Sequence, residues 1–117
     1  MKEQCLILNE SSDFYDAIKK LDENGNGVLP IIDKEGFFVG LITDGDIRKA
    51  ILNKTLDLEH IINKYPHTLL DSTTSSERII FLKRIKRRHL PIVDKDNYLI
   101  DVFTLDELDF KVMPNPV

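Results

Sequence analysis

The sequence predicts an α/β (α+β) domain built from two copies of one β-α-β-β-α unit. The first observation is an internal repeat: LPIIDKEGFFVGLIT at 29–43 returns 61 residues later as LPIVDKDNYLIDVFT at 90–104. The second is that each copy places strand-forming residues on both sides of a polar turn, and the third is that a helical pattern precedes each copy. Chance similarity between two hairpins is the alternative, but the flanking segments correspond as well. Two such copies are two structural units, since a solenoid needs more and shorter repeats.

The first copy begins with an apolar strand expected at Cys5–Leu8. A helix should follow, because apolar residues recur at i, i+4 and i+7; Ser11 or Ser12 is expected to cap it and Asn24-Gly25 to end it. The four polar residues 33–36 then join two strands as an antiparallel hairpin.

The second copy repeats these features. A short strand is expected at Thr68–Leu70, and residues 74–77 have the S/T-x-x-E form of a capping box, which predicts the start of a helix. The turn of the second hairpin falls at 94–97. After each hairpin another helix is expected, IRKAILN at 47–53 and a shorter LDELDF at 105–110.

A hairpin flanked by two helices cannot cover both of its faces alone. The two copies are therefore expected to pack sheet against sheet about a pseudo-twofold axis, with a cleft between them. The predicted organisation is a first repeat at 1–57, a second at 58–111, and the start of a linker at 112–117.

Composition narrows the functional classes. The chain has 117 residues with 42% hydrophobic content, enough for one compact domain, and its net charge of -4 gives no general attraction to nucleic acid or anionic membranes. The single cysteine excludes an internal disulfide, and no apolar run approaches the roughly 20 residues of a membrane helix. We expect a soluble cytoplasmic protein that binds neither nucleic acid nor membrane.

Two long segments carry a resemblance to a known family. VLPIIDKEGFFVGLITDGDIRKAI and RHLPIVDKDNYLIDVFTLDEL resemble the two halves of a cystathionine-β-synthase (CBS) domain pair, and T-x-x-D at 43–46 matches that family's ribose-binding motif. The resemblance implies a regulatory module that binds AMP, ADP, ATP or a related ligand in its cleft, with no obligatory cofactor. It also implies association of two pairs into a homodimer.

A narrower resemblance concerns the protein to which such a pair is attached. TDGDIRKAIL, DLEHIINKYPHT and MPNPV at 113–117 are similar to the CBS pair that precedes bacterial sugar-phosphate nucleotidyltransferases. This implies a C-terminal enzyme domain in a longer protein. Arabinose-5-phosphate isomerases carry a similar pair, but there it follows the enzyme, so the first parent is favoured.

The stretch Thr43-Asp44-Gly45-Asp46 has two interpretations. As structure, a threonine followed by an acid three residues later is close to a capping box. As a site, the Asp46 carboxylate offers acceptors to ribose hydroxyls, Thr43 could donate to a phosphate, and Gly45 lets a ligand approach a helix N-terminus. The two interpretations are compatible if Thr43 caps through one lone pair and donates outward.

The corresponding stretch in the second copy departs from the family pattern. Thr104 is retained, but Glu107 stands where aspartate is expected and the glycine is missing. T-x-x-E is the proper form of a capping box, which favours a structural role here. Thr104 and Glu107 remain candidate ligand residues, and one occupied site per chain is a possible outcome.

The run KRIKRRH at 83–89 is the basic concentration of the chain. Most of it is expected to be a solvated helix face, but Arg88 and His89 directly precede a strand, and the resemblance places such residues at the cleft, where they could meet phosphates. Thr68 and Arg48 are weaker candidates. As a nucleic-acid surface the run is poor, because no aromatic residues are interleaved.

Catalysis finds little support in the sequence. His60, His67 and His89 do not have a metal-ligand spacing, and Cys5 in an apolar strand is expected to be a buried, inert thiol. Phosphate-binding glycine loops are absent. We therefore expect no enzyme activity from this chain alone, no catalytic residues and no metal site. The alternative function is a structural dimerisation module whose clefts hold no ligand.

Overall fold

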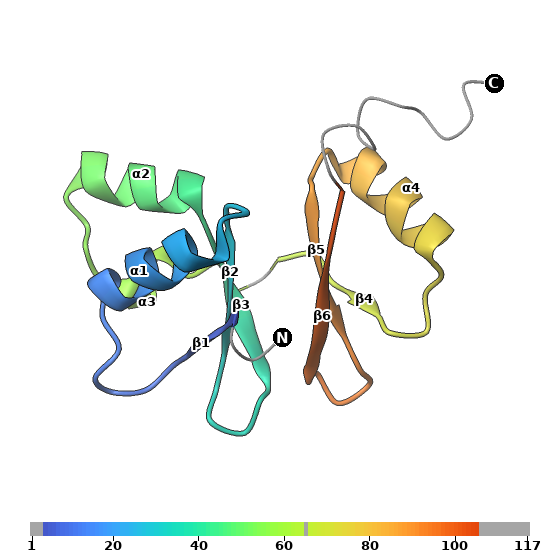
Figure 1. Ribbon diagram of the computed structural model, residues 1–117, viewed down its shortest axis with the longest axis horizontal. Coiled ribbons are helices and arrows are strands. Elements are labelled where there is room, and N and C mark those ends of the chain that lie inside the picture. Colours follow the sequence, from blue (N-terminus) through green and yellow to red (C-terminus); the bar gives the residue numbers. More distant parts are fainter. Residues whose placement is uncertain (1–3, 65, 106–117) are drawn as a thin grey trace.

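The computed structural model describes residues 4–64 and 66–105 (Figure 1). Its helices and strands follow in this order: β1 (Leu6–Ile7), α1 (Phe14–Asn24), β2 (Val28–Ile32), β3 (Phe38–Thr43), α2 (Asp44–Asn53), α3 (Leu58–Ile61), β4 (Leu69–Leu70), α4 (Ser75–Ile85), β5 (His89–Val93) and β6 (Leu99–Thr104).

The strands form two sheets with one topology, ordered β1-β2-β3 and β4-β5-β6. In each sheet the first pair is parallel and the second is an antiparallel hairpin. Both hairpins have the same register, with Leu29 opposite Ile42 in one and Leu90 opposite Phe103 in the other. The predicted α+β class and the repeat are confirmed. The helix expected at 105–110 lies outside the described residues except for Leu105.

The predicted hairpin turns are confirmed, and an aspartate organises each of them. Asp33 Oδ1 accepts hydrogen bonds from the N–H groups of Glu35 and Phe37, at 3.0 and 2.9 Å. Asp94 Oδ1 makes the same two bonds in the second turn, at 2.9 and 3.0 Å. A short side chain that satisfies local N–H groups is the reason aspartate begins such turns.

The start of α1 differs from the prediction. Its N-cap is Asp13, which forms a reciprocal capping box with Asp16, so the expectation of Ser11 or Ser12 was wrong. Both serines instead hydrogen-bond within the preceding turn, around Asn9. Asx and Ser side chains compete for the same backbone groups, and here Asp13 is the one at the required distance from the first turn.

Two other predicted helix ends are confirmed, whereas the helix expected at 47–53 begins earlier, at Asp44, and α3 was not predicted. Gly25 ends α1 in the left-handed conformation, at φ 69°, and Thr74 opens α4 through a capping box with Glu77. A left-handed residue favours glycine because it lacks a Cβ. None of the helices in the described part of the chain is long and apolar enough to cross a membrane.

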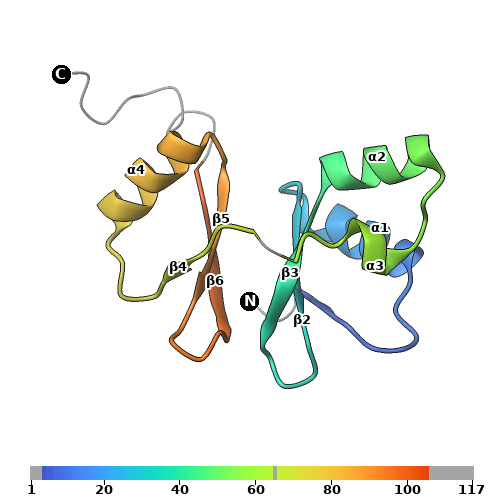
Figure 2. The same cartoon turned by 180° about the vertical axis from the view of Figure 1, so that it is seen from behind.

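The sheets face each other and the helices lie on the outside. α1, α2 and α3 cover one sheet and α4 covers the other, in both views (Figures 1 and 2). Each repeat has its own apolar core, and a smaller cluster between the sheets joins them; its buried members are Val28, Phe38, Leu41 and Val93.

A pseudo-twofold axis passes between the two hairpins. Phe37 and Tyr98, which occupy equivalent positions in the repeat, stack with ring centroids 4.3 Å apart and planes inclined by 20°. The neighbouring backbone bonds are reciprocal: Phe38 donates to the Asn97 carbonyl at 2.9 Å, and its counterpart Leu99 donates to the Gly36 carbonyl at 3.4 Å. Contacts between equivalent residues are what a twofold arrangement produces.

The segment after α2 crosses from the first repeat to the second. α3 begins just after the predicted repeat boundary, yet Leu58 and Ile61 pack into the core of the first repeat. Asn63 then pairs with Leu41 at the edge of β3, through backbone bonds of 2.9 and 3.0 Å. A Cβ on Gly40 would meet the Asn63 carbonyl oxygen, so this close approach requires glycine.

Candidate functional site

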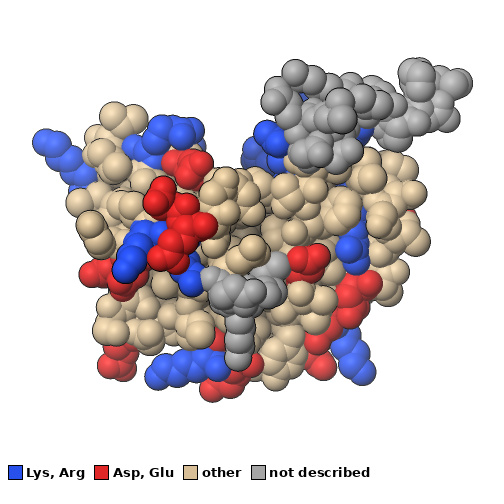
Figure 3. Space-filling model, viewed as in Figure 1, with Lys and Arg blue, Asp and Glu red and all other residues tan. Residues whose placement is uncertain are grey.

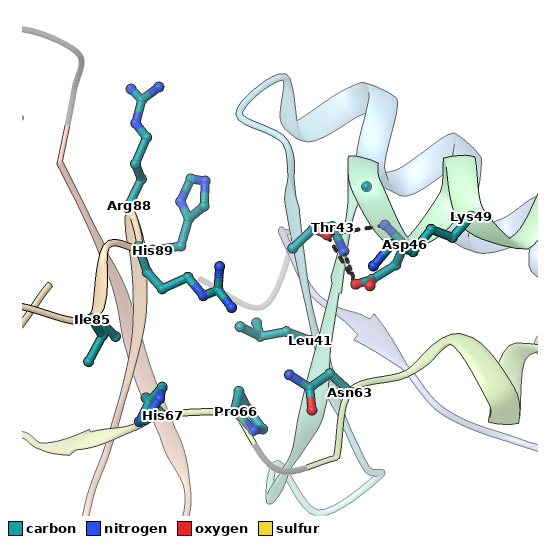
Figure 4. A pocket seen from close by; sticks show the side chains of 12 residues that line it. Leu41, Thr43, Asp46, Lys49, Asn63, Pro66, His67, Ile85, Arg88 and His89 are labelled. Atoms are coloured by element: carbon teal, nitrogen blue, oxygen red, sulfur yellow. Dashed lines mark hydrogen bonds between the residues drawn. The ribbon is translucent and has the colours of Figure 1, made fainter.

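The main candidate site is a pocket of about 470 Å³ between the two repeats. It lies within the range of volumes typical of small-molecule sites. In the space-filling view the two halves of the molecule are separated by a notch, with basic side chains on both of its sides (Figure 3). The lining residues come from both repeats and from the crossing segment: Leu41, Thr43, Gly45, Asp46, Lys49, Asn63, Pro66, His67, Ile85, Arg87, Arg88 and His89 (Figure 4).

Thr43 and Asp46 form one wall of the pocket, at the junction of β3 and α2. Asp46 Oδ2 accepts hydrogen bonds from the Thr43 N–H at 2.9 Å and from the Thr43 hydroxyl at 3.0 Å, while the Asp46 N–H donates to Thr43 Oγ1 at 3.3 Å (Figure 4). The hydroxyl thus donates inward to Asp46, whereas the sequence suggested that it would donate outward. Asp46 Oδ1 accepts no hydrogen bond from any described residue and remains able to bind a ligand.

Capping by itself does not distinguish this stretch. α1, α2 and α4 all begin with a capping box, formed by Asp13 with Asp16, Thr43 with Asp46, and Thr74 with Glu77. Of these three, the box of α2 is the one whose two side chains line the pocket. Its position, and not its hydrogen bonding, makes it a candidate ligand site.

The start of α2 also presents backbone to the pocket. Gly45 lines it, and a Cβ at this position would make ordinary contacts of 3.7 Å with Thr43 and Arg48. The glycine is therefore not required by packing within the protein, and its lack of a side chain leaves the backbone open to a ligand. The N-terminal end of a ten-residue helix favours negative charge.

Three cationic side chains line the pocket. Lys49 lies one turn after Asp46 on α2, and Arg87 and Arg88 lie between α4 and β5. Arg88 donates from Nε to the Leu105 carbonyl at 3.2 Å. Among the described residues, the side chains of Lys49 and Arg87 have no hydrogen-bond or ion-pair partner. Their charge is thus available to an anion.

His89 adds a titratable group to the same wall. It is half-buried at the start of β5, and its Nδ1 lies 3.3 Å from the Thr104 hydroxyl. Burial, and secondarily the positive charge of Arg88, lower the pKa of His89, although Asp44 acts in the opposite direction. The imidazole therefore favours its neutral form, and an anionic ligand would favour protonation.

The structure brings together five of the eight site residues predicted from the sequence: Thr43, Gly45, Asp46, Arg88 and His89. Thr68 and Thr104 do not line the pocket, nor does the weaker candidate Arg48, whose exposed side chain lies on α2 beside Gly45. Thr104 instead contacts His89. Glu107 lies outside the described residues.

Sequence reasoning missed several lining residues. Arg87 belongs to the basic run that was singled out, but the run was assigned to solvent except for its last two members. Lys49 follows Asp46 by three residues, a spacing that puts both on one helix face. Asn63, Pro66 and His67 belong to the crossing segment, and no local pattern indicates that this segment closes the pocket.

The described residues include no group of three or more His, Cys, Asp or Glu side chains that could hold a metal ion. Cys5 is buried, as expected, although it lies just before β1 and not within the strand. The pocket offers acceptors, cations and the imidazoles of His67 and His89, a combination suited to binding a phosphorylated ligand with hydroxyl groups.

Comparison with known proteins agrees with this description. Residues 1–53 match the family described as CBS domain. The homoserine O-acetyltransferase of Methanococcoides burtonii is 28% identical over 112 residues, which are 93% of this chain and 22% of that enzyme. The chain thus spans about a fifth of the length of this curated relative.

Solved structures of CBS proteins share the fold. A crystal structure of CBSX2 in complex with AMP is 25% identical, with a TM-score of 0.73 over 94% of this chain and 87% of that one. The CBS domain pair of protein MJ0100, in complex with 5-methylthioadenosine and S-adenosyl-L-methionine, is 23% identical, with a TM-score of 0.76 over 93% of this chain and 90% of that one. The similarity extends over both repeats.

Proposed function

We propose that this chain is a regulatory module that binds a nucleotide between its repeats. Its fold is that of a CBS domain pair, and its first repeat matches the CBS family. The observation that carries the proposal is one pocket lined both by the capping carboxylate of Asp46 and by Arg87 and Arg88 of the other repeat. The ligands of the two solved CBS proteins contain adenosine, which favours an adenine nucleotide over other nucleotides as the ligand.

Different side chains of the pocket bind different parts of the nucleotide. The free oxygen of Asp46 accepts from ribose hydroxyls, while its other oxygen remains in the cap of α2. Lys49, Arg87 and Arg88 contact the phosphates through charge-assisted hydrogen bonds, the stronger kind. The base lies against the apolar and backbone parts of the pocket, around Leu41 and Ile85.

A ligand that contacts both repeats can regulate an attached domain by changing how the repeats are arranged. It favours the relative arrangement of the repeats in which its contacts are complete, by as much as its affinity differs between the two arrangements. The homoserine O-acetyltransferase match shows a related segment within a longer enzyme. We propose a sugar-phosphate nucleotidyltransferase as the attached enzyme, on the resemblance of TDGDIRKAIL and MPNPV, and a cytoplasmic location.

A thermal-shift screen tests the binding proposal. The purified chain is heated with AMP, ADP, ATP, CMP, CTP or GDP, since a ligand at 100 times its dissociation constant stabilises by about 2.7 kcal/mol. Asp46→Ala should reduce affinity at least about tenfold, corresponding to one lost charged hydrogen bond. Glu77→Ala is the matched control, because it removes the same kind of cap from α4, away from the pocket.

The outcomes separate binding from capping. If Asp46→Ala abolishes the shift and Glu77→Ala preserves it, the carboxylate binds the ligand. If no nucleotide stabilises the protein, the role of Thr43 and Asp46 is to cap α2, and the proposal fails.

A structural dimerisation module is the second candidate. It is favoured by apolar side chains exposed at the end of α2 and just after it: Ile51, Leu52 and Leu56 are 55%, 80% and 57% exposed. Exposed apolar groups close together often mark a protein interface. Sedimentation equilibrium with and without Leu52→Glu tests this function, which requires a dimer that the variant dissociates and that nucleotides do not affect.

A further inference from the structure

The pseudo-twofold axis relates the pocket to an equivalent place at the other end of the cleft. The 61-residue register pairs Ile85 with Asn24, His89 with Val28, and Thr43 with Thr104. Leu6 pairs with Ile31 in the first sheet as Leu69 pairs with Ile92 in the second, so Leu6 and Leu69 are equivalent. Two residues before them, Gln4 is therefore the counterpart of His67. We name this place the counterpart site; its described residues are Gln4, Asn24, Asn26, Gly27, Val28, Val102 and Thr104.

The two places differ in charge. The register pairs Arg87 with Asn26 and Arg88 with Gly27, and it pairs Lys49 with a phenylalanine, so each cation of the pocket is replaced by a neutral residue. It also pairs Gly45 and Asp46 with two acids; these acids and the phenylalanine lie outside the described residues. A phosphate is therefore attracted to the cations of the pocket, whereas the described residues of the counterpart site offer it none.

The two places also differ in hydrogen bonding. The side-chain amide of Asn24 donates to the carbonyl oxygens of Gln4 and Val28, at 2.8 and 3.1 Å. It thereby ties the residues before β1 to the start of β2 across the counterpart site. In the pocket, the equivalent position is Ile85, which has no side-chain donor, and His67 and His89 line open space (Figure 4).

We propose that each chain binds one nucleotide, that this nucleotide requires its phosphate, and that the counterpart site binds none. The inference rests on the proposed function and adds the stoichiometry and the ligand class. A nucleoside reaches Asp46 but leaves Lys49 and Arg87 without a partner, so it should bind at least about tenfold more weakly than its nucleotide.

Isothermal titration of the 117-residue chain with AMP, ATP and adenosine tests the inference. We expect one AMP or ATP per chain and at least tenfold weaker adenosine binding. Arg87→Gln should weaken AMP binding at least fivefold and leave adenosine binding unchanged, because adenosine does not use that cation. Arg84→Gln is the charge-matched control: Arg84 lies on α4, three residues before Arg87, and does not line the pocket, so AMP binding should not change.

Three results would overturn the inference and leave the proposed function standing: two nucleotides per chain, adenosine binding as tight as AMP binding, or equal weakening of both by Arg87→Gln. Failure of AMP and ATP to bind at all, together with a negative nucleotide screen, overturns both the inference and the proposed function.

Discussion

Thr43 and Asp46 hydrogen-bond in both directions at the first turn of α2, and the two bonds that Asp46 accepts from Thr43 end on the same carboxylate oxygen, Oδ2. The cap and a ligand can therefore use the same residue at the same time. This resolves the two interpretations of the stretch, which are not exclusive: Oδ2 stabilises the helix, and Oδ1 remains available. The local stability of α2 and the affinity of the pocket are coupled through this one side chain.

Removing the hydroxyl of an N-cap threonine should lower stability at either α2 or α4, but should weaken nucleotide binding only at α2. Thr43→Ala and Thr74→Ala should each lower the free energy of unfolding by about 1 kcal/mol, the usual cost of losing a threonine N-cap. Thr43→Ala should also weaken nucleotide binding, because the hydroxyl orients the Asp46 carboxylate. Urea unfolding and titration of both variants check this; equal binding by the two would show that the hydroxyl does not orient the carboxylate.

Adding one methyl group to β3 should disrupt the crossing segment. In Gly40→Ala the new Cβ would occupy the space of the Asn63 carbonyl oxygen, so backbone must shift, and we expect a loss of about 1–3 kcal/mol, typical of overpacking. Asp101, the exposed counterpart in β6, is the control position, and Asp101→Ala should cost less. Similar denaturation midpoints for the two variants would contradict the role assigned to Gly40.

Stability should depend on pH through His89. Its pKa is lowered from 6.5 by burial, so below that pH the unfolded chain binds the proton more readily than the folded chain. Stability should thus fall as the pH falls below 6.5, and His89→Asn should reduce this loss. Melting temperatures of both proteins between pH 5 and pH 8, about the range of histidine titration, test this. Parallel pH profiles would exclude the effect.

The affinity for a nucleotide should depend on pH in the opposite sense to stability, through the same histidine. A phosphate near the imidazole favours its protonated form, so affinity for AMP should rise as the pH falls toward 6 or so. His89→Asn should flatten the affinity profile, apart from the titration of the phosphate itself. Calorimetric titrations in buffers of different ionisation enthalpy would report how many protons are taken up on binding. If His89→Asn takes up the same number, the proton binds to another group.

The stacked rings at the axis should couple the repeats. Phe37 and Tyr98 are equivalent residues in contact, and a double-mutant cycle with alanine should give a coupling of about 0.5–1.5 kcal/mol. Tyr15→Ala is the control for Tyr98→Ala, because Tyr15 is 74% exposed on α1. Additive effects of Phe37→Ala and Tyr98→Ala on urea unfolding would show that the stack contributes nothing to the joining of the repeats.

Periodicity and the internal repeat were enough to predict the local structure and the symmetry. The repeat of LPIIDKEGFFVGLIT, with its apolar alternation and aspartate turns, predicted both hairpins, their common register and the pseudo-twofold packing. It also predicted that the cleft would contain Thr43, Asp46, Arg88 and His89. These features follow from spacing along the chain, which periodicity and capping rules describe directly.

The residues that complete the pocket could not be predicted from local patterns. Lys49, His67 and Arg87 are far apart in the chain, yet they line one pocket, and the crossing segment that carries His67 packs against Gly40 and β3. Similarly, Asn24 crosslinks Gln4 and Val28 although no motif indicates it. Sequence patterns report which face of an element is buried, whereas the partner of a polar side chain depends on distances that arise only when separate elements pack together.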